Sequence, residues 1–477
     1  MQARYDLIVI GGGAAGFAGA MRAMDFGKRT LLIEKHRIGG AALSGGALSS
    51  KTWWELAKDF DKLFLTDRGY RVKDFEFSFA DFRRIVETAV EERRHQMLRQ
   101  INHYHHLGML DLVYGTASFV EPHRIQVHPR DGEPFYAEAD YFLIATGSRP
   151  RTIPNLPIDG KRIFTSDHID SLEEFPSDLL IVGSGVIGCE FASIFSTFPR
   201  LRVTMIEKAD RILPYEDPDV SDTVMQNLSE CNVRFFTCAQ LASLRVEEEG
   251  VYYEVEEKSG MRHKEKASHV LVAVGRVPNS EGLGLAEIGV EIDVSGHVWS
   301  QQTQTSVPHI FVAGDLDTQK AGFVNVAEQE ARYAVERMFR RVKRPLEYDH
   351  LSWIMFLRPE VAGVGLNEQQ AQAQGYAYRV VRYNYDMTAR GIAMRTKRSF
   401  FKLITTDEPD PYIIGCRAVG PQASSIIGVV AMMIRFSRRV SDLCSILQPH
   451  PALTEGIQEC ARALLGEAIF KPELLLE

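Results

Sequence analysis

The sequence predicts an α/β fold made of two similar doubly wound units and a separate α+β domain at the C-terminal end. Three observations support this prediction. An apolar run near the N-terminus ends in a glycine-rich turn and a helix, and the same pattern returns after residue 178. From about residue 352, apolar runs and helical stretches alternate without such a turn. Repeated strand, turn and helix patterns are typical of parallel sheets covered by helices.

The composition excludes several classes of protein. The chain has 477 residues, 45% hydrophobic and 25% charged, which suits a globular protein of roughly three domains. A formal net charge of −8 provides no basic field for nucleic acid or an anionic membrane. The apolar run 7–21 is too rich in glycine for a signal helix. Without a targeting segment, and with six cysteines in no metal-ligand spacing, we expect a cytoplasmic protein.

The first glycine turn has the residues that a dinucleotide pyrophosphate requires. An apolar run, 5–10, ends in Gly11-Gly12-Gly13-Ala14-Ala15-Gly16, and a helix is predicted from Phe17. The first glycine permits a tight turn, the second lets the pyrophosphate approach, and the third lets helix pack on strand. The next strand ends in Glu34, whose carboxylate can accept hydrogen bonds from ribose hydroxyls. The alternative is a tight turn with a surface glutamate.

The pattern repeats in the second unit. The run 179–182 leads into Gly183-Ser184-Gly185-Val186-Ile187-Gly188, with a helix predicted from Cys189. A strand at 203–206 ends in Glu207. Two such patterns imply two dinucleotide-binding, Rossmann-like domains and two adenine dinucleotides. Glu207 would repel a 2′-phosphate, which favours NAD over NADP, although Lys208 and Arg211 could weaken the preference.

Three further runs are expected to complete these units. The runs 141–147 and 270–275 are predicted buried strands that end in glycine and match each other as closing strands. A third run, 309–315, places Asp315 just past a strand, within reach of sugar-like hydroxyls. A helix is predicted from about Val324, and the alternative role for Asp315 is a helix N-cap.

A long polar helix is predicted at about 80–106. It ends in His103-Tyr104-His105-His106. Adjacent histidines on a helix point to different faces, so we predict no metal site there.

Taken together, these segments resemble the pyridine nucleotide-disulfide oxidoreductases, and among them most the dihydrolipoamide dehydrogenases. The resemblance covers nearly the whole chain. Besides the glycine loops, it is carried by these motifs: ATG at 145–147, RILPYEDPDVS from 211, VGRVPN from 274, AGD at 313–315, RPEVAGVGLNEQQA from 358, and HPALTE at 450–455.

The resemblance implies four segments and two cofactors. These are an FAD-binding domain in two parts, 1–152 and 282–350, an NAD-binding domain at 153–281, and a dimerisation domain at 351–477 that makes a homodimer. The residues implied to contact FAD are Gly11, Gly13, Ala14, Ala15, Gly16, Glu34, Gly40, Ala41, Lys51, the backbone near Ala117, Thr146, Gly147, Gly314, Asp315 and Val324. Those implied to contact NAD are Gly183, Gly185, Val186, Ile187, Gly188, Glu207 and Gly275.

The resemblance also implies two pairs of catalytic side chains. Lys51 and Glu190 match a pair beside the flavin N5, where an ammonium favours negative charge on the reduced ring. An ordinary buried ion pair is the alternative. His450 and Glu455 match a dyad that reaches the partner subunit's active site and shuttles protons, or they are retained without a role. Two neighbouring family histidines are replaced here, by Gln448 and Asn325.

One segment breaks the family pattern. The family has approximately GGTCLNVGCIPSK, whereas residues 39–51 read GGAALSGGALSSK, with Ala42 and Ala47 at the cysteine positions. Thiol–disulfide exchange needs a thiolate, so no dithiol relay is expected. The prediction is a diaphorase-type NAD(P)H oxidoreductase that passes electrons from NADH through FAD to a small non-disulfide acceptor such as a quinone. Trp53 and Trp54 would line its pocket or pack in the core.

Two alternatives remain open at this point. One is a flavoprotein oxidoreductase that uses the thiols of a lipoyl-carrier partner. The other is a non-catalytic flavin-bound scaffold or redox sensor, whose redox state alters binding to another protein.

Overall fold

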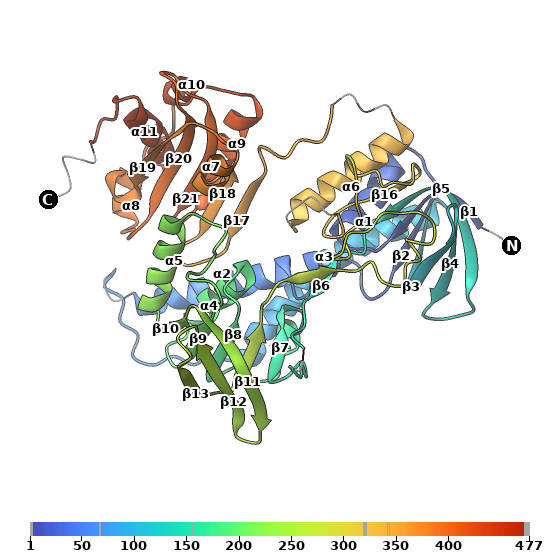
Figure 1. Cartoon of the computed structure of the whole chain (residues 1–477), viewed down its shortest axis with the longest axis horizontal. Coiled ribbons are helices and arrows are strands. Elements are labelled where there is room, and N and C mark those ends of the chain that lie inside the picture. The colour runs from blue at the N-terminus through green and yellow to red at the C-terminus, as the bar shows by residue number, and fades with distance from the viewer. Residues whose placement is uncertain are drawn as a thin grey trace. The chain divides into compact units, whose positions relative to one another are not determined.

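Figure 1 shows the computed structural model of the chain, which describes residues 3–65, 68–154, 156–317, 322–340, 342 and 344–471. Its elements group into two compact units. The first runs through residues up to 56, 71–175 and 272–346, and the second through 57–70, 176–271 and from 347 onward. The four predicted segment boundaries stay a prediction, and their outer ends, residues 1 and 477, lie outside the described residues.

The first unit is built on a six-stranded sheet. Its parallel strands lie in the order β3 (Leu110–Glu121), β2 (Thr30–Glu34), β1 (Ala3–Ile10), β5 (Phe135–Ile144) and β16 (Ile310–Val312). An antiparallel strand, β4 (Arg124–Pro129), pairs with both β3 and β5. This order places the carboxyl ends of β1, β2, β5 and β16 along one edge, which is where α/β sheets bind ligands.

Both faces of the central strand β1 are covered. Leu7 and Val9 belong to one apolar cluster, whereas Ile8 and Ile10 belong to another. Successive strand side chains point to opposite faces, so a continuous apolar run is what a strand between two cores requires. Helices α1 (Ala14–Asp25) and α6 (Val324–Phe339) pack together on the first of these faces (Figure 1).

A long helix, α3 (Phe79–His106), also belongs to the first unit, and the helix predicted at 80–106 is confirmed. Its first turn is capped by the Ser78 hydroxyl, which accepts the Asp81 N–H at 3.3 Å. A buried stripe runs along it at helical spacing: Phe82, Val86, Val90, Arg94, Met97 and Ile101. Five of these six side chains are apolar, so the arginine among them needs its own explanation.

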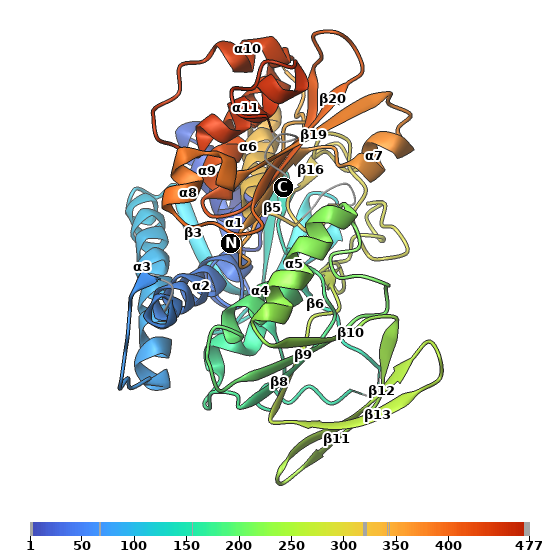
Figure 2. The ribbon, with the colours of Figure 1, turned by 90° about the vertical axis from the view of Figure 1, so that its left-hand side faces the viewer.

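The second unit contains a further sheet in which β10 (Val233–Phe236), β9 (Arg202–Ile206) and β8 (Asp178–Val182) are parallel neighbours, and β14 (His269–Val272) lies next to β8. Helices α4 (Val186–Phe195) and α5 (Pro218–Glu230) pack on these strands (Figure 2). An antiparallel sheet follows, formed by β11 (Ala239–Glu247), β12 (Gly250–Glu257) and β13 (Arg262–Ala267).

The C-terminal part of the second unit is an antiparallel sheet with helices, as the sequence predicts. Its strands lie in the order β17 (Ser352–Met355), β18 (Val361–Gly365), β21 (Ile413–Val419), β20 (Phe400–Thr406) and β19 (Tyr378–Asn384). Helices α9 (Ala423–Arg435), α10 (Val440–Ser445) and α11 (Thr454–Leu464) complete its core. Within that core, Tyr385 and Phe401 stack with their ring centroids 4.1 Å apart.

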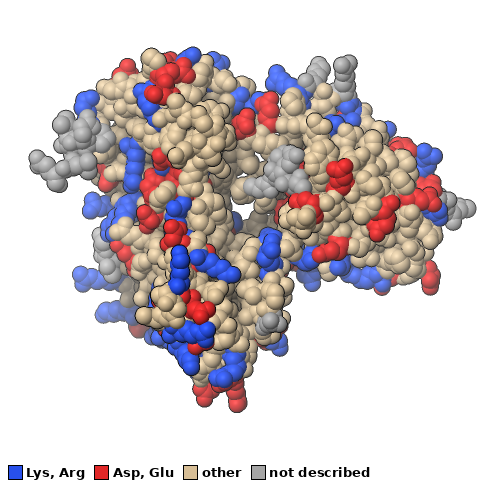
Figure 3. Space-filling view, viewed as in Figure 1, with Lys and Arg blue, Asp and Glu red and all other residues tan. Residues whose placement is uncertain are grey.

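Two observations bear on the surface. In the part of the chain that the structure describes, no helix has the length and apolarity needed to cross a membrane. On the face shown in Figure 3, basic and acidic side chains are interspersed, in keeping with the net charge of −8.

The starts of two predicted helices are wrong by three residues. The helices begin at Ala14 and Val186, not at Phe17 and Cys189. Glycine has low helix propensity, so the sequence predicts helices that begin only after Gly16 and Gly188. In the structure Gly16 and Gly188 lie inside the first turn, and the residues preceding the two helices are Gly13 and Gly185.

Candidate cofactor-binding site

The first glycine loop leaves an open stretch of backbone at the start of α1. Gly11 has a φ of +103°, which favours glycine, and its N–H donates to Ile33 O at 2.8 Å. A Cβ on Gly16 would lie 1.7 Å from Gly11 O, so strand and helix pack too closely for a side chain. A Cβ on Gly13 would meet none of the described atoms within 4 Å. The loop is therefore closed at Gly16 and open at Gly13.

The second loop repeats this geometry. Gly183 has a φ of +99°, and a Cβ on Gly188 would lie 2.1 Å from Gly183 O. A Cβ on Gly185 would again meet nothing within 4 Å in the described part of the chain. Neither helix has a side-chain cap at its N-terminus, because the N-cap residue is Gly13 in the first and Gly185 in the second. Such helix N-termini suit an anionic pyrophosphate.

The two acidic residues also occupy matching positions. Glu34 Oε2 accepts the Gly12 N–H at 2.6 Å, and Glu207 Oε2 accepts the Ser184 N–H at 2.9 Å. The other carboxylate oxygen accepts the N–H two residues further along the chain in each case, at 2.7 and 2.9 Å. Each carboxylate is thus fixed beside its glycine loop, at the end of the second strand, as the sequence predicts.

The pKa of Glu207 lies below its usual value. Burial would raise this pKa, but hydrogen bonds from Ala209 and from the backbone and hydroxyl of Ser184 outweigh the effect of burial. Glu207 is therefore negatively charged at neutral pH and disfavours a phosphate beside it.

Backbone hydrogen bonds align the other FAD-contacting candidates with the first loop. Ala145 N–H donates to Ile10 O at 2.8 Å, and Ala313 N–H donates to Ile144 O at 3.1 Å. These bonds bring the ends of β1, β5 and β16 together, and with them Thr146, Gly147, Gly314 and Asp315. One edge of the sheet therefore carries most of the predicted FAD contacts.

Asp315 is held in place from a neighbouring strand end. Its Oδ2 accepts a hydrogen bond from the Ser148 hydroxyl at 2.5 Å. The N-cap of α6 is Phe323, whose side chain provides no cap, so the alternative role of Asp315 as a helix N-cap is wrong. Val324 begins that helix, as predicted.

Two of the predicted cofactor-contacting residues, Ala117 and Gly275, are placed less favourably for contact with a dinucleotide. The Ala117 side chain is buried in an apolar cluster, so only its backbone is available to a ligand. Gly275 has a φ of +100°, and its carbonyl accepts the Arg151 N–H at 2.9 Å. It belongs to the first unit, whereas the Gly183 loop belongs to the second, so a shared NAD site stays a prediction.

The segment after β2 contains the positions where the family pattern breaks. Gly40 and Ala41 are exposed and lie in a short 3-10 helix, 40–42. Ala42 and Ala47 are half-buried, and Ala47 begins α2 (Ala47–Asp61). Lys51 is half-buried on α2, and its Nζ donates to the Ser50 hydroxyl at 3.2 Å. Methyl groups, not sulfur, are therefore presented at 42 and 47.

Trp53 and Trp54 are buried, whereas Ala42, Ala47 and Lys51 are half-buried. Trp53 is fully buried, with its ring centroid 4.8 Å from that of Phe82. Trp54 is also buried. Of the two roles considered for them, core packing fits these positions.

Glu190 and the dyad lie in the second unit. Glu190 is buried in α4, and its Oε1 accepts the Phe356 N–H at 2.9 Å. Lys51 lies in the first unit, so its pairing with Glu190 stays a prediction. His450 Nδ1 lies 2.8 Å from Glu455 Oε1, and the His450 side chain is 71% exposed. Burial would raise the pKa of Glu455, but hydrogen bonds from Ala452 and His450 lower it.

Comparisons with known proteins decide the family. Residues 5–331 match the family described as pyridine nucleotide-disulphide oxidoreductase, and residues 351–461 match its dimerisation domain. The chain belongs to the pyridine nucleotide-disulphide oxidoreductase family. Members of this family use FAD and NAD(H), and the two open glycine loops with their adjacent glutamates fit such dinucleotides.

Several relatives cover nearly the whole chain. A dihydrolipoyl dehydrogenase from Bacillus subtilis is 31% identical over 97% of this chain and 99% of its own length. One from Zymomonas mobilis is 28% identical over 98% and 100%. The crystal structure of LpdA from Mycobacterium tuberculosis has a TM-score of 0.87 at 28% identity, covering 97% of this chain and 99% of that one. The fold class predicted from the sequence is confirmed.

A more distant structure agrees in fold alone. It is a Cu(II) complex of the HOCl-induced flavoprotein disulfide reductase RclA from Escherichia coli, with a TM-score of 0.85 at 23% identity. It covers 97% of this chain and 100% of that chain.

In this family member, burial makes four of the six cysteines unsuited to thiolate chemistry. The sequence has no cysteine before Cys189 and none between residues 272 and 346, so the first unit has none at all. Burial raises the pKa of Cys416 to about 12 and that of Cys444 to about 11, and it also raises the pKa of the Cys189 and Cys460 thiols. These four thiols stay protonated at neutral pH.

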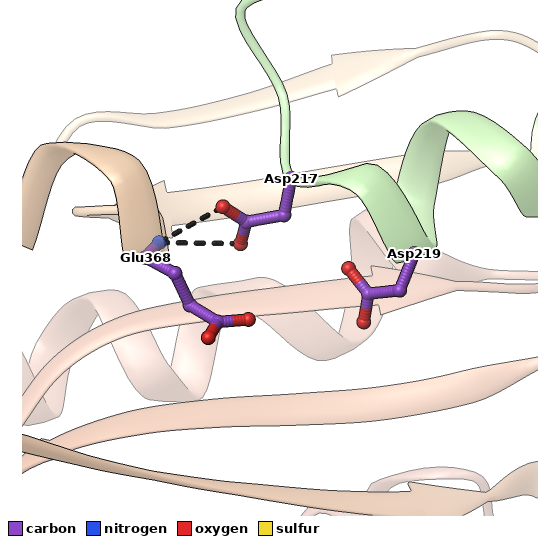
Figure 4. A group of neighbouring side chains, drawn as sticks. All are labelled: Asp217, Asp219 and Glu368. Atoms are coloured by element: carbon purple, nitrogen blue, oxygen red, sulfur yellow. Dashed lines mark hydrogen bonds between the residues drawn. The ribbon is translucent and has the colours of Figure 1, made fainter.

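An acidic cluster in the second unit escaped the sequence analysis. Asp217 precedes α5, Asp219 lies in its first turn and Glu368 begins α7 (Glu368–Ala373); Asp217 accepts the Glu368 N–H (Figure 4). Their carboxylate oxygens lie close enough to hold a metal ion. However, the buried ammonium of Lys402 lies among them, 3.0 Å from Asp217 and 2.8 Å from Asp219, and it also pairs with Glu368.

The charge balance explains this cluster without a metal. Burial would lower the pKa of Lys402, but hydrogen bonds from its ammonium to Asp219, Glu368 and Asp217 raise it. The ammonium occupies the position that a cation would take. The sequence does not predict this cluster because Lys402 lies far along the chain from the acidic residues, and no local pattern links residues 217, 368 and 402.

Proposed function

We propose that this chain is a diaphorase-type NAD(P)H oxidoreductase that passes electrons through FAD to a non-disulfide acceptor such as a quinone. The observation that carries the proposal is that the FAD-binding unit contains no cysteine. Exchange with a disulfide proceeds through attack by a thiolate, so this unit has no group that can begin it. When bound, FAD supplies two-electron transfer from a nicotinamide and delivery to an acceptor.

The residues of the site have distinct proposed roles. FAD would be held by Gly11, Gly13, Ala14, Ala15, Gly16, Glu34, Gly40, Ala41, the Ala117 backbone, Thr146, Gly147, Gly314, Asp315 and Val324. NAD would be held by Gly183, Gly185, Val186, Ile187, Gly188, Glu207 and Gly275. The Lys51 ammonium, fixed by Glu190, would favour negative charge on the reduced ring. His450, oriented by Glu455, would donate a proton to the reduced acceptor across a homodimer.

The chemistry of the replaced positions favours a flat organic acceptor. Ala42 and Ala47 present methyl groups and are half-buried. A methyl is smaller and less polar than a thiol, so the surface they form would suit an aromatic ring. A quinone has such a ring and accepts two electrons with two protons.

The direct test separates the two half-reactions. Anaerobic mixing of the holoenzyme with NADH should bleach the flavin absorbance, and menadione should then restore it. If neither NADH nor NADPH bleaches the flavin, the proposal is wrong, and a flavin-bound scaffold or sensor would take its place. Retention of a partner on pull-down would then support that role.

A second candidate arises from the relatives, which are dihydrolipoyl dehydrogenases. In that case a dithiol on a lipoyl-carrier partner would supply the thiols that the first unit lacks. Dihydrolipoamide and NADH are compared as reductants of the flavin under identical anaerobic conditions. Faster bleaching by dihydrolipoamide would favour the second candidate, whereas bleaching by NADH alone would favour the first.

Glu207 should determine the choice of nicotinamide. We expect Glu207→Ser to improve kcat/KM for NADPH relative to NADH by about tenfold or more, because a fixed negative charge near the 2′-position is removed. Steady-state kinetics with both nucleotides provide the measurement. Glu248→Ser, at an exposed acidic position in the same unit, serves as the control. An unchanged NADPH to NADH ratio would show that Glu207 does not face the ribose.

A further inference from the structure

The segment Ala42–Ala47 is folded into a compact turn. Ser44 N–H donates to Gly40 O at 3.2 Å, and Ser49 N–H donates to Leu43 O at 3.1 Å. A Cβ on Gly46 would lie 1.7 Å from Ala41 O, so the turn packs closely on itself. In the family pattern the two cysteines stand at the ends of this turn.

Arg94, on α3, binds the turn through hydrogen bonds. Its side chain is only 6% exposed and lies within the otherwise apolar stripe of that helix. Its Nη2 donates to the Ser44 hydroxyl at 2.7 Å, and its Nε donates to Ile38 O at 3.2 Å. Its remaining donor group pairs with Glu91. A buried guanidinium is tolerated only when its donors are satisfied, and here two of the acceptors lie in or beside the turn.

Asp170 binds Gly45, the residue after Ser44, and it lies in a different element, the 3-10 helix 166–171. Its Oδ2 accepts the Gly45 N–H at 2.9 Å, and its Oδ1 accepts the indole N–H of Trp53 at 3.4 Å. A Cβ on Gly45 would lie 2.6 Å from Asp167 Cα, so the turn lies directly on this 3-10 helix. Asp170 therefore connects the middle of the turn to the start of α2.

We propose that Arg94 and Asp170 are positioning residues that fix Ala42 and Ala47 at the face that meets the electron acceptor. This inference rests on the proposed function. A disulfide between the two ends of a short loop restricts that loop covalently. Here a buried guanidinium and a half-buried carboxylate hold its central residues, Ser44 and Gly45, from two separate elements. The clamp restricts the same loop without a thiol, and the acceptor surface stays ordered in both redox states.

The test measures both half-reactions of the holoenzyme separately by anaerobic stopped flow. The variants are Arg94→Gln, Asp170→Asn and the milder Ser44→Ala, which removes the hydroxyl acceptor but keeps Arg94 and Glu91. We expect flavin reduction by NADH to stay within about twofold of the unmodified enzyme, while KM for menadione rises by roughly tenfold. The family resemblance implies that the nicotinamide approaches the other face of the ring, so we expect its half-reaction to depend on the turn much less than that of the acceptor.

Two further variants sharpen the comparison. Arg94→Lys keeps the charge but not the fork of donors that reaches Ser44 and Ile38 together, so it should resemble Arg94→Gln. Arg84→Gln removes a guanidinium that is 73% exposed on the same helix and should leave KM for menadione unchanged.

The outcomes are distinguishable. An unchanged KM for menadione in Ser44→Ala and Asp170→Asn would overturn the inference, and so would a parallel fall of both half-reactions with loss of FAD. If the unmodified enzyme is bleached by NADH but menadione does not restore the flavin, the proposed function fails instead. Because Ser44→Ala deletes a single hydroxyl, it keeps the test valid even where Arg94→Gln does not fold.

Discussion

Alanine at Gly13 should weaken FAD binding, and alanine at Gly185 should weaken NADH binding, each without loss of the fold. An added methyl meets no described atom within 4 Å at either position, so the protein alone tolerates it. It would, however, occupy the space through which a pyrophosphate approaches the loop. A forced shift of about 1–3 kcal/mol corresponds to a roughly 5- to 150-fold loss of affinity.

The two substitutions are controls for each other. Gly13→Ala should raise Kd for FAD, measured by flavin fluorescence, and leave the Tm of the FAD-free protein within a few degrees. Gly185→Ala should keep its FAD and raise KM for NADH. Gly16→Ala differs from both, since its methyl would lie 1.7 Å from Gly11 O and should lower the Tm itself. Loss of FAD from Gly185→Ala, with none from Gly13→Ala, would contradict the assignment of the two loops.

Removal of the Lys402 ammonium should destabilise the protein strongly. In Lys402→Met, Asp217 remains fully buried beside Asp219 and Glu368 with no cation to balance them. Loss of one partner from a buried ion pair costs about 3–5 kcal/mol. Because the pKa of Lys402 is raised, its stabilisation is complete at neutral pH and is lost only as the pH rises through that raised pKa.

The measurement is urea unfolding at neutral pH, with two matched variants. Lys397→Met removes an exposed lysine nearby in sequence and should change the free energy of unfolding by less than about 0.5 kcal/mol. Lys402→Met combined with Asp219→Asn should recover part of the loss, since one unbalanced charge is removed. Chelation by EDTA should have no effect on the Tm. A large EDTA effect would show that a metal, not Lys402, balances the three carboxylates.

The sequence predicted the parts of the site that depend on local pattern. A glycine loop, the helix after it and the acidic end of the next strand lie within one short stretch of chain, so Gly11, Gly13 and Glu34 were identifiable. The second copy of the pattern supported the first, and the structure gives both loops the same geometry.

Features that join distant segments could not be predicted in this way. Arg94 interrupts an apolar helical stripe because it donates hydrogen bonds to the Ser44 hydroxyl and the Ile38 carbonyl. These acceptors lie some fifty residues earlier in the chain, so no local pattern links them to Arg94. Lys402 lies in β20, and the residues next to it in the sequence do not indicate an acidic partner. The predicted starts of two helices are wrong because each first turn contains a glycine. Close packing at that glycine outweighs its low helix propensity. Each of these departures lies at a charged or closely packed position where tertiary contacts outweigh local preference.

An anaerobic titration of the oxidised holoenzyme with NADH tests the absence of a dithiol relay most directly. A flavin accepts two electrons, and a disulfide beside it would accept two more. We expect complete bleaching after about one equivalent of NADH per FAD, with no thiol gained on reduction. A requirement for about two equivalents, together with two newly alkylatable thiols, would reveal a redox-active disulfide and contradict the proposed mechanism.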